Sequence, residues 1–472
     1  MRTDTWLASL IARQGPGVLG RFGRFYDALA ALPRRARRAL QKRWAVSLAG
    51  AALLLALGFS APPAAQAATI VVDGVNCTLA DAIVAANTNT AVNGCTGGSG
   101  ADVISLMTDV TLTSVHNMLY GPNGLPLVES AITIAGNGHT LARAAAAPPL
   151  RLLTVASGGN LTINHLDLQN GYTGNAAGGA LLNVASTASA SLTLNDSTVS
   201  GSSTTFAFGG GITNFGFPPY VATMTINRST ISGNSASASS TVGGGGIVNL
   251  GTTAHLTLND STVTGNTAAS AAGGGGIVNA NYSTYGVGSV TLNRSVVSGN
   301  TAGVGDDIRN DTGGTFTANN YNVLGDSGDT NAQAFAGFTP CSGAGCTDVS
   351  ATSNGTQPTS RANILSATLA DNGGPTLTHA LAGGSPAVDL IPTSHPACNP
   401  PATTDQRGAV RADGLSRGGA GCDAGAFELG SVQTPSAVSL RSLAATSGAA
   451  WETAAAGAGA LLVSLGLLRR RR

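Results

Sequence analysis

Two neighbouring aspartates, Asp306 and Asp307, come nearest in this sequence to a catalytic carboxylate pair. Cleavage of a polysaccharide needs two carboxyl groups, or a carboxylate beside a basic residue, around the scissile bond. Arg309 follows two residues later and could supply the positive charge. In an extended strand, however, adjacent side chains point to opposite faces. We therefore expect Asp306 and Asp307 to be structural, and we expect no catalytic residues.

A second acidic pair, Asp326 and Asp329, lies in a glycine-rich turn. Because Ca²⁺ takes about six to eight oxygen ligands, this turn offers too few for a metal site. The histidines His165, His255 and His379 are scattered, and we expect them at the surface or in turns. The triple-glycine stretches precede neither a helix nor a lysine, so they are interpreted as turns rather than nucleotide cradles. The sequence therefore predicts no metal and no cofactor.

Four charged residues recur at one place in successive repeats, namely Asp196, Arg228, Asp260 and Arg294. If the repeats stack in register, these residues form a column of alternating charge along one edge. Opposite charges on adjacent rungs favour the native register, although an exposed pair contributes only ~0–1 kcal/mol. We interpret the column as register-setting, with a binding role as the alternative.

The elements that position these residues belong to a tandem repeat. One recurring phrase consists of glycines, an aliphatic residue and a final asparagine. Successive final asparagines are 31, 35, 30 and 31 residues apart, at Asn183, Asn214, Asn249, Asn279 and Asn310. A second phrase, of the type Leu-Thr-Leu-Asn, keeps the same step and ends on Asn164, Asn195, Asn227, Asn259 and Asn293. Two phrases in step at one period indicate a solenoid whose units stack on one another.

One repeat, residues 244–273, predicts three short strands separated by glycine and asparagine turns. Three strands in ~30 residues make one coil of a three-sided, all-β solenoid, with coils about 4.8 Å apart. Its inward residues form aliphatic ladders with those of the next coil, Ile247 with Ile277 and Leu256 with Val290 among them. The recurring asparagines are expected to form hydrogen-bonded ladders that satisfy buried backbone groups.

Both ends of the chain are basic, whereas the middle is acidic. The chain has 24 basic and 23 acidic residues. Residues 1–67 and 451–472 together hold 14 of the basic and 3 of the acidic residues. Residues 68–450 therefore keep 10 basic and 20 acidic residues, a net charge of about −10. The middle also contains no lysine. Because phosphate contacts need clustered basic side chains, nucleic acid is disfavoured as a partner.

The termini indicate export and anchoring. Residues 1–67 have a long basic region, an apolar stretch at 45–59 and a small-residue cleavage site between Ala67 and Ala68, as in a signal peptide. A first transmembrane helix is the alternative. The tail, residues 454–472, has fifteen apolar or small residues before four arginines and predicts a short membrane helix of ~22 Å. A buried helix is the alternative there.

All six cysteines lie in the part predicted to be exported, where disulfides are stable. They are Cys77, Cys95, Cys341, Cys346, Cys398 and Cys422. None lies inside the regular repeats, which suits disulfides at the two ends of the solenoid. Nearest-neighbour pairing is one of fifteen possible connectivities.

Two segments resemble modules of bacterial surface proteins. Residues 68–106, with the phrase Cys77-Thr-Leu-Ala-Asp-Ala-Ile and then Gly94-Cys95, are similar to the CSLREA-type N-terminal domain. That family carries Arg and Glu where this sequence has Ala80 and Asp81. Residues 369–428 resemble the choice-of-anchor Q region through five phrases in order: 369–376, 379–381, 384–389, 405–408 and 422–428. The resemblance implies a right-handed parallel β-helix exported to the bacterial surface.

These observations predict seven segments: a signal peptide (1–67), an N-terminal cap (68–110), β-helix repeats (111–325), a loop (326–362), a β-rich anchor-type module (363–430), a linker (431–453) and a membrane or sorting tail (454–472). Within the module, residues 405–408 and Asp423 are expected to form a buried ion pair. The predicted function is a surface-anchored structural or adhesive protein whose partners are the envelope membrane and glycans or other surface proteins. The alternative is a polysaccharide lyase, a glycosidase or a glycan-binding protein using one face of the β-helix.

Overall fold

The computed structural model describes residues 33, 68–205, 208–237, 243–269, 273–398, 403–411 and 421–431. The predicted signal peptide (Pro33 apart), most of the linker and the predicted tail therefore lie outside the described residues. So does Ala67, on one side of the predicted cleavage site. In the described part of the chain no helix is long and apolar enough to cross a membrane.

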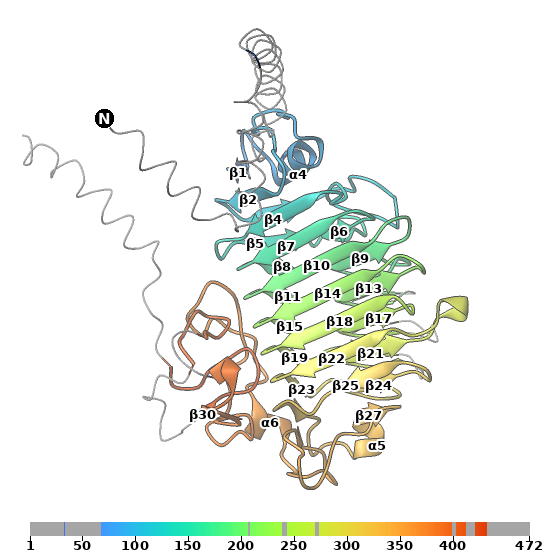
Figure 1. Ribbon diagram of the computed structural model, residues 1–472, viewed down its shortest axis with the longest axis vertical. Coiled ribbons are helices and arrows are strands. Elements are labelled where there is room, and N and C mark those ends of the chain that lie inside the picture. Colours follow the sequence, from blue (N-terminus) through green and yellow to red (C-terminus); the bar gives the residue numbers. More distant parts are fainter. Residues whose placement is uncertain are drawn as a thin grey trace, which may run out of the picture. The chain divides into compact units, whose positions relative to one another are not determined.

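The described residues form an all-β parallel solenoid in which coils stack along one axis (Figure 1). Three long parallel sheets run along it. The first sheet contains, in spatial order, β1 (Thr69–Val72), β2 (Asp102–Leu106), β4 (Ala131–Ala135), β7 (Asn160–Asn164), β10 (Ala190–Asn195), β14 (Ala222–Asn227), β18 (Ala254–Asn259), β22 (Ser289–Asn293) and β25 (Thr315–Thr317).

The second sheet contains β3 (Val110–Leu112), β5 (Thr140–Arg143), β8 (Asp167–Gln169), β11 (Thr198–Ser200), β15 (Thr230–Ser232), β19 (Thr262–Thr264), β23 (Val296–Ser298), β26 (Val323–Leu324) and β28 (Val349–Ser350). The third contains β6 (Leu153–Val155), β9 (Leu181–Ala185), β13 (Ile212–Gly216), β17 (Ile247–Leu250), β21 (Ile277–Ala280), β24 (Ile308–Asn310) and β27 (Phe335–Ala336). A short fourth sheet has β12 (Ser203–Thr204), β16 (Ser235–Ala236) and β20 (Thr267–Ala268).

The core is built from aliphatic ladders, as the repeat predicts. Leu256 of β18 pairs in register with Met224 of β14 and with Val290 of β22. Ile247 and Ile277 pair likewise between β17 and β21. All five side chains are buried. Each such side chain stabilises the fold by roughly 1.5–3 kcal/mol through removal of apolar surface from water.

Asparagine ladders tie the coils together, which confirms the prediction. In the inner ladder, Asn214 Nδ2 donates to Asn249 Oδ1 at 2.8 Å and Asn249 Nδ2 donates to Asn279 Oδ1 at 2.9 Å. The same amides also bond backbone carbonyls, so that they satisfy buried polar groups between strands. An outer ladder joins Asn164, Asn195, Asn227, Asn259, Asn293 and Asn320. A third joins Asn234, Asn266 and Asn300.

The N-terminal cap begins with a strand and a helix. β1 pairs in parallel with β2, so the cap supplies the first rung of the first sheet. Helix α4 (Leu79–Thr88) begins after Thr78, whose hydroxyl accepts a hydrogen bond from the backbone N–H of Asp81. Leu79 and Ile83 on its buried face pack into the core cluster of the solenoid. The helix thereby covers apolar side chains at this end of the stack.

Residues 326–362 differ from the predicted loop. They contain helix α5 (Asn331–Ala334) and strands β27 and β28, which extend the third and second sheets. The predicted module begins close to helix α6 (Arg361–Ile364). In its described part it is mostly irregular rather than β-rich, with strands β29 (Ile391–Pro392) and β30 (Gly421–Cys422) and the short 3-10 helix η2 (Pro396–Cys398).

The module docks along the outer face of the second sheet. Gln406 bridges two coils: its Oε1 accepts from Thr230 Oγ1 at 2.7 Å, and its Nε2 donates to Thr198 Oγ1 at 2.9 Å. One coil further, the backbone N–H of Ala426 donates to Thr262 Oγ1 at 3.1 Å. The module therefore contacts the same threonine position on three successive coils.

Candidate functional site

The cysteines form the three nearest-neighbour disulfides, Cys77–Cys95, Cys341–Cys346 and Cys398–Cys422. The first closes the N-terminal cap, the second lies in the segment after the last full coils, and the third staples β30 into the module. None of the six thiols is free. They are thus structural rather than nucleophilic or metal-binding.

The four residues of the charge column stand in register, each with a left-handed backbone (φ between 43° and 51°). They form two separate ion pairs. Arg228 Nε lies 2.7 Å from Asp196 Oδ1, and Arg294 Nη2 lies 2.9 Å from Asp260 Oδ2. Each arginine thus reaches back to the aspartate one coil earlier. The hydrogen bonds to Asp196 raise the pKa of Arg228, so the pair stays charged.

Asp306 and Asp307 take different partners, as strand alternation predicts. Asp307 is 0% exposed, and its Oδ1 accepts from Asn300 Nδ2 at 2.8 Å. It therefore ends the third asparagine ladder and does not reach solvent. Asp306 is half-buried and accepts a hydrogen bond from the backbone N–H of Ala302. Because Asp307 is sealed from solvent, it is not placed to act on a substrate together with Asp306.

The other acidic pair is linked to Asp306. The carboxyl groups of Asp306 and Asp329 lie close enough to influence each other's pKa, and burial raises the pKa of Asp306. Burial, together with the charges of Asp306 and Asp326, raises the pKa of Asp329 to about 6. Burial also raises the pKa of Asp307 well above its usual range. The positions of Asp306 and Asp329 in the sequence do not predict that they lie close together. They meet because helix α5 and the turn before it pack against the repeat phrase that contains Asp306.

The module contains two buried ion pairs. Arg407 Nη2 lies 2.6 Å from Asp405 Oδ2, which confirms the predicted pair. Asp423 does not join it; its carboxylate accepts from the backbone N–H groups of Asp389 and Leu429. The second pair was not predicted.

That second pair links Arg411 Nη1 to Glu428 Oε2 at 3.4 Å. Burial raises the pKa of Glu428. The partner of each group lies in a different stretch of the module, so sequence order could not show it. These groups hold the module together.

The histidines differ from one another. His255 is exposed and contacts Ser289, and His165 lies 3.9 Å from Asp196. His379, expected at the surface or in a turn, is instead buried between the module and the second sheet. Its Nε2 lies 2.8 Å from Ser232 Oγ, and its Nδ1 lies 2.8 Å from the Ser366 carbonyl. Burial lowers its pKa to about 4, so it stays neutral and structural at pH 7.

Arg151 is a structural residue that the sequence analysis missed. It is fully buried, and neutral groups satisfy it: its guanidinium donates to Asn123 Oδ1 at 2.6 Å and to Thr154 Oγ1 at 3.0 Å. Backbone carbonyls of residues 120, 177 and 178 accept its remaining hydrogen bonds. Burial lowers its pKa to about 9. The sequence does contain one indication that Arg151 is buried, since it lies between the two apolar residues Leu150 and Leu152.

Five aromatic rings from three separate stretches gather at one place. The Phe215 and Phe217 rings stack with centroids 3.9 Å apart, and Tyr285 meets both edge-on. Tyr282 lies near Tyr285 and contacts Phe208 at 4.8 Å. Tyr282 and Tyr285 belong to the loop around helix η1 (Ser283–Tyr285). The fold thus brings together aromatic residues from segments that are far apart in the sequence.

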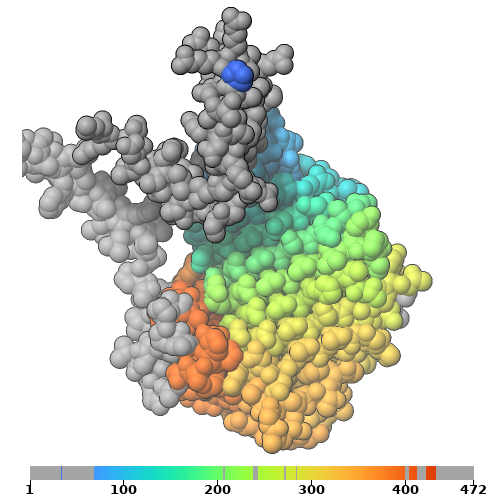
Figure 2. All heavy atoms as spheres, in the orientation of Figure 1, coloured from blue at the N-terminus to red at the C-terminus, as the bar shows by residue number. Residues whose placement is uncertain are grey.

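Two of these rings, Phe208 and Phe215, pack against a small apolar patch on the outer face of the third sheet, formed by Val248, Leu250, Val278 and Ala280. The aromatic cluster, defined as Phe208, Phe215, Phe217, Tyr282 and Tyr285, therefore has a packing role. Tyr282 is nevertheless 41% exposed. Figure 2 shows the solenoid as a stack of bands in sequence order.

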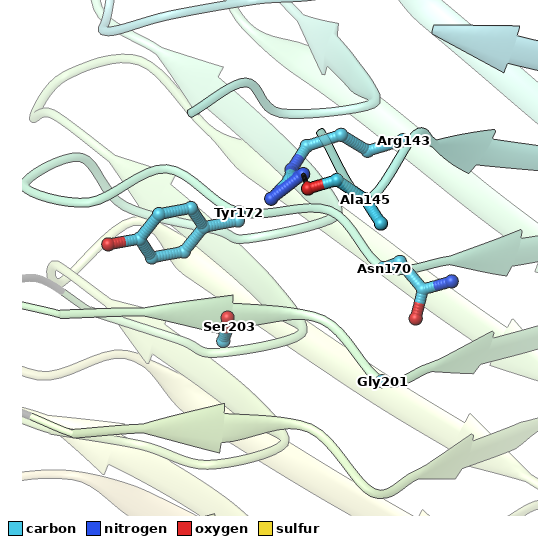
Figure 3. A pocket seen from close by; sticks show the side chains of 6 residues that line it. All are labelled: Arg143, Ala145, Asn170, Tyr172, Gly201 and Ser203. Atoms are coloured by element: carbon cyan, nitrogen blue, oxygen red, sulfur yellow. Dashed lines mark hydrogen bonds between the residues drawn. The ribbon is translucent and has the colours of Figure 1, made fainter. Parts of the chain in front are cut away.

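A shallow pocket of about 540 Å³ opens where strands of the second sheet end. It is lined by Arg143, Ala145, Asn170, Tyr172, Gly201 and Ser203, which come from three successive coils (Figure 3). The Arg143 guanidinium lies 5.6 Å from the centroid of the Tyr172 ring. No group of histidine, cysteine and acidic residues in the described part of the chain could hold a metal ion.

No protein-family model, no curated protein and no solved structure matches this chain. The fold and its contacts define the class: a disulfide-bonded parallel β-solenoid repeat protein.

Proposed function

We propose that this chain is an exported, surface-anchored protein with a structural or adhesive role, built as a right-handed, three-sided β-helix of the CSLREA and choice-of-anchor Q type. Asparagine ladders through the coils and disulfides in the cap and in the segments after the last full coils support a stable, secreted scaffold. The basic signal-like start and the apolar tail ending in four arginines support export and attachment to the envelope membrane.

The aromatic cluster is the observation that carries the adhesive part. Tyrosine and phenylalanine are enriched in binding interfaces because they bury a large area at small entropic cost. Tyr282 and Tyr285 stand on a loop that departs from the repeat and adds nothing to the ladders. Asp307, by contrast, is sealed inside the stack, which argues against catalysis by the Asp306–Asp307 pair.

The test measures both surface display and attachment. Cells producing the full chain are treated with protease and then assayed for attachment to host cells or to glycan-coated surfaces. We expect the chain to be cleaved on intact cells, and a Tyr282→Ser, Tyr285→Ser double variant to lose most attachment. Met118→Ser, which changes an exposed apolar residue outside the cluster, is the matched control.

Protection from protease on intact cells would reject the surface role, and unchanged attachment of the double variant would reject the cluster. The mass of the mature protein tests both predicted processing sites, at Ala67–Ala68 and in the tail. Product release from a polysaccharide panel, abolished by Asp306→Ala or Asp307→Ala, would instead establish the enzyme alternative.

A further inference from the structure

The pocket of Figure 3 has an uncompensated positive charge. Arg143 has no carboxylate partner among the described residues, whereas Arg228, Arg294, Arg309, Arg407 and Arg411 each pair with an aspartate or glutamate. The surrounding chain is acidic, with a net charge of about −10 over residues 68–450. An unpaired cation in that setting is a local attraction for anions.

Part of the Arg143 guanidinium is left without a protein acceptor. Its Nη1 donates to the carbonyl oxygens of Ala144, Ala145 and Ala147, at 2.6, 3.3 and 3.3 Å. These contacts fix the direction of the guanidinium. Its Nε is buried and has no hydrogen-bond partner in the described part of the chain.

An aromatic ring lies next to this cation. Arg143 stands over the Tyr172 ring, and the Tyr172 hydroxyl is held 2.9 Å from Thr205 Oγ1. Tyr172 is thus fixed from both ends and half-buried. A ring of this kind offers an apolar face beside a polar edge. The C–H face of a pyranose ring complements such a surface.

On the side of the pocket opposite Tyr172, the side-chain amide of Asn170 is available to a ligand. Asn170 is exposed, and its side chain makes no hydrogen bond to any described residue. Gly201, one coil further, has φ +60°, and a Cβ there would lie 2.8 Å from Asn170 Oδ1. The glycine therefore leaves the amide accessible from the pocket. Ser203 adds a hydroxyl at the lower edge (Figure 3).

We propose that this pocket binds a carboxylate-bearing sugar unit of an acidic polysaccharide. The carboxylate pairs with Arg143, the sugar ring lies against Tyr172, and Asn170 and Ser203 bond its hydroxyls. A planar guanidinium is the side chain best matched to a carboxylate. Because the pocket is shallow and runs across three coils, it suits a segment of an extended polymer. This inference deepens the adhesive role and rests on it.

The test is a calorimetric titration of the purified full-length chain with a galacturonic acid tetramer, a galactose tetramer and sodium sulfate. We expect saturable binding of the acidic tetramer, with the neutral tetramer and sulfate at least tenfold weaker. Arg143→Gln should weaken binding of the acidic tetramer by tenfold or more. Arg361→Gln is the matched control, because Arg361 also lacks a carboxylate partner among the described residues but lies outside the pocket.

Equal affinity for the acidic and neutral tetramers, or an unchanged Arg143→Gln variant, would overturn the carboxylate-bearing class. Sulfate binding as strong as the acidic tetramer would reduce the pocket to an anion site and overturn the sugar. Absence of binding at concentrations up to about 10 mM would overturn the pocket as a whole. The titration does not depend on display, so failure here leaves the protease and attachment results on cells standing. Circular dichroism confirms that each variant is folded.

Discussion

Arg228 forms a two-point ion pair with Asp196, the residue at its own position one coil earlier: Nε to Oδ1 is 2.7 Å and Nη2 to Oδ2 is 2.8 Å. Parallel strands place equal positions of adjacent coils about 4.8 Å apart, so a guanidinium reaches back to a carboxylate in both hydrogen bonds at once. The alternation of Asp and Arg along the edge is thus expressed as two pairs, with Arg294 and Asp260 as the second.

Reversal of the charge at Arg228 should destabilise the solenoid. Arg228→Asp places a second carboxylate one coil from Asp196 and leaves both without a cation. We expect a loss of roughly 1–2 kcal/mol, measured as a lower urea midpoint at low salt. The exchanged variant, Asp196→Arg with Arg228→Asp, should recover most of the loss. An unchanged midpoint at low salt would refute the register-setting role.

The inner asparagine ladder should contribute more than the outer one. Asn249→Ala removes an amide that bonds Asn214, Asn279 and the Ala254 carbonyl, and so leaves buried groups unsatisfied. We expect a loss of roughly 3 kcal/mol, read from urea denaturation. Asn259→Ala, in the half-buried outer ladder, should cost about 1 kcal/mol. Equal losses would show that burial does not decide the value of a ladder position.

Asp307→Asn should stabilise the chain. The amide oxygen keeps the bond from Asn300, while the ionisable group that burial disfavours is removed. We expect a gain of roughly 1–2 kcal/mol at pH 7 that shrinks toward pH 4, where the aspartate is protonated. The measurement is the melting temperature across this range. Asp307→Ala, which deletes the acceptor, should melt lower than wild type. A lower melting temperature for Asp307→Asn would contradict the argument.

Stability should fall as pH rises through the titration of Asp329. Its pKa is raised from 3.8 to about 6 in the folded chain, so the native state binds the proton more tightly than the unfolded state. The stabilising contribution is complete below about pH 4 and is lost by about pH 7. Asp329→Asn should flatten this part of the profile. The lowered pKa of His379 gives stability a pH dependence of the opposite sign. Because His379 titrates in the wild type and in the variant alike, this contribution cancels when the two profiles are compared. Parallel profiles would refute the raised pKa of Asp329.

Sequence periodicity alone determined the solenoid, its inward aliphatic residues, its asparagine ladders and the in-register column from Asp196 to Arg294. Each of these depends on equal positions one period apart, and stacking places such positions next to each other. The disulfides join cysteines that are neighbours in the sequence, which is one of the fifteen connectivities that the sequence left open.

Only the tertiary structure decided contacts between residues that are not one period apart. The docking of Gln406 on Thr198 and Thr230, the burial of His379, the proximity of Asp306 to Asp329, and the Arg143–Tyr172 pocket all depend on how irregular segments fold back onto the coils. No repeat links these positions, so the free energy that selects them comes from packing and desolvation in three dimensions.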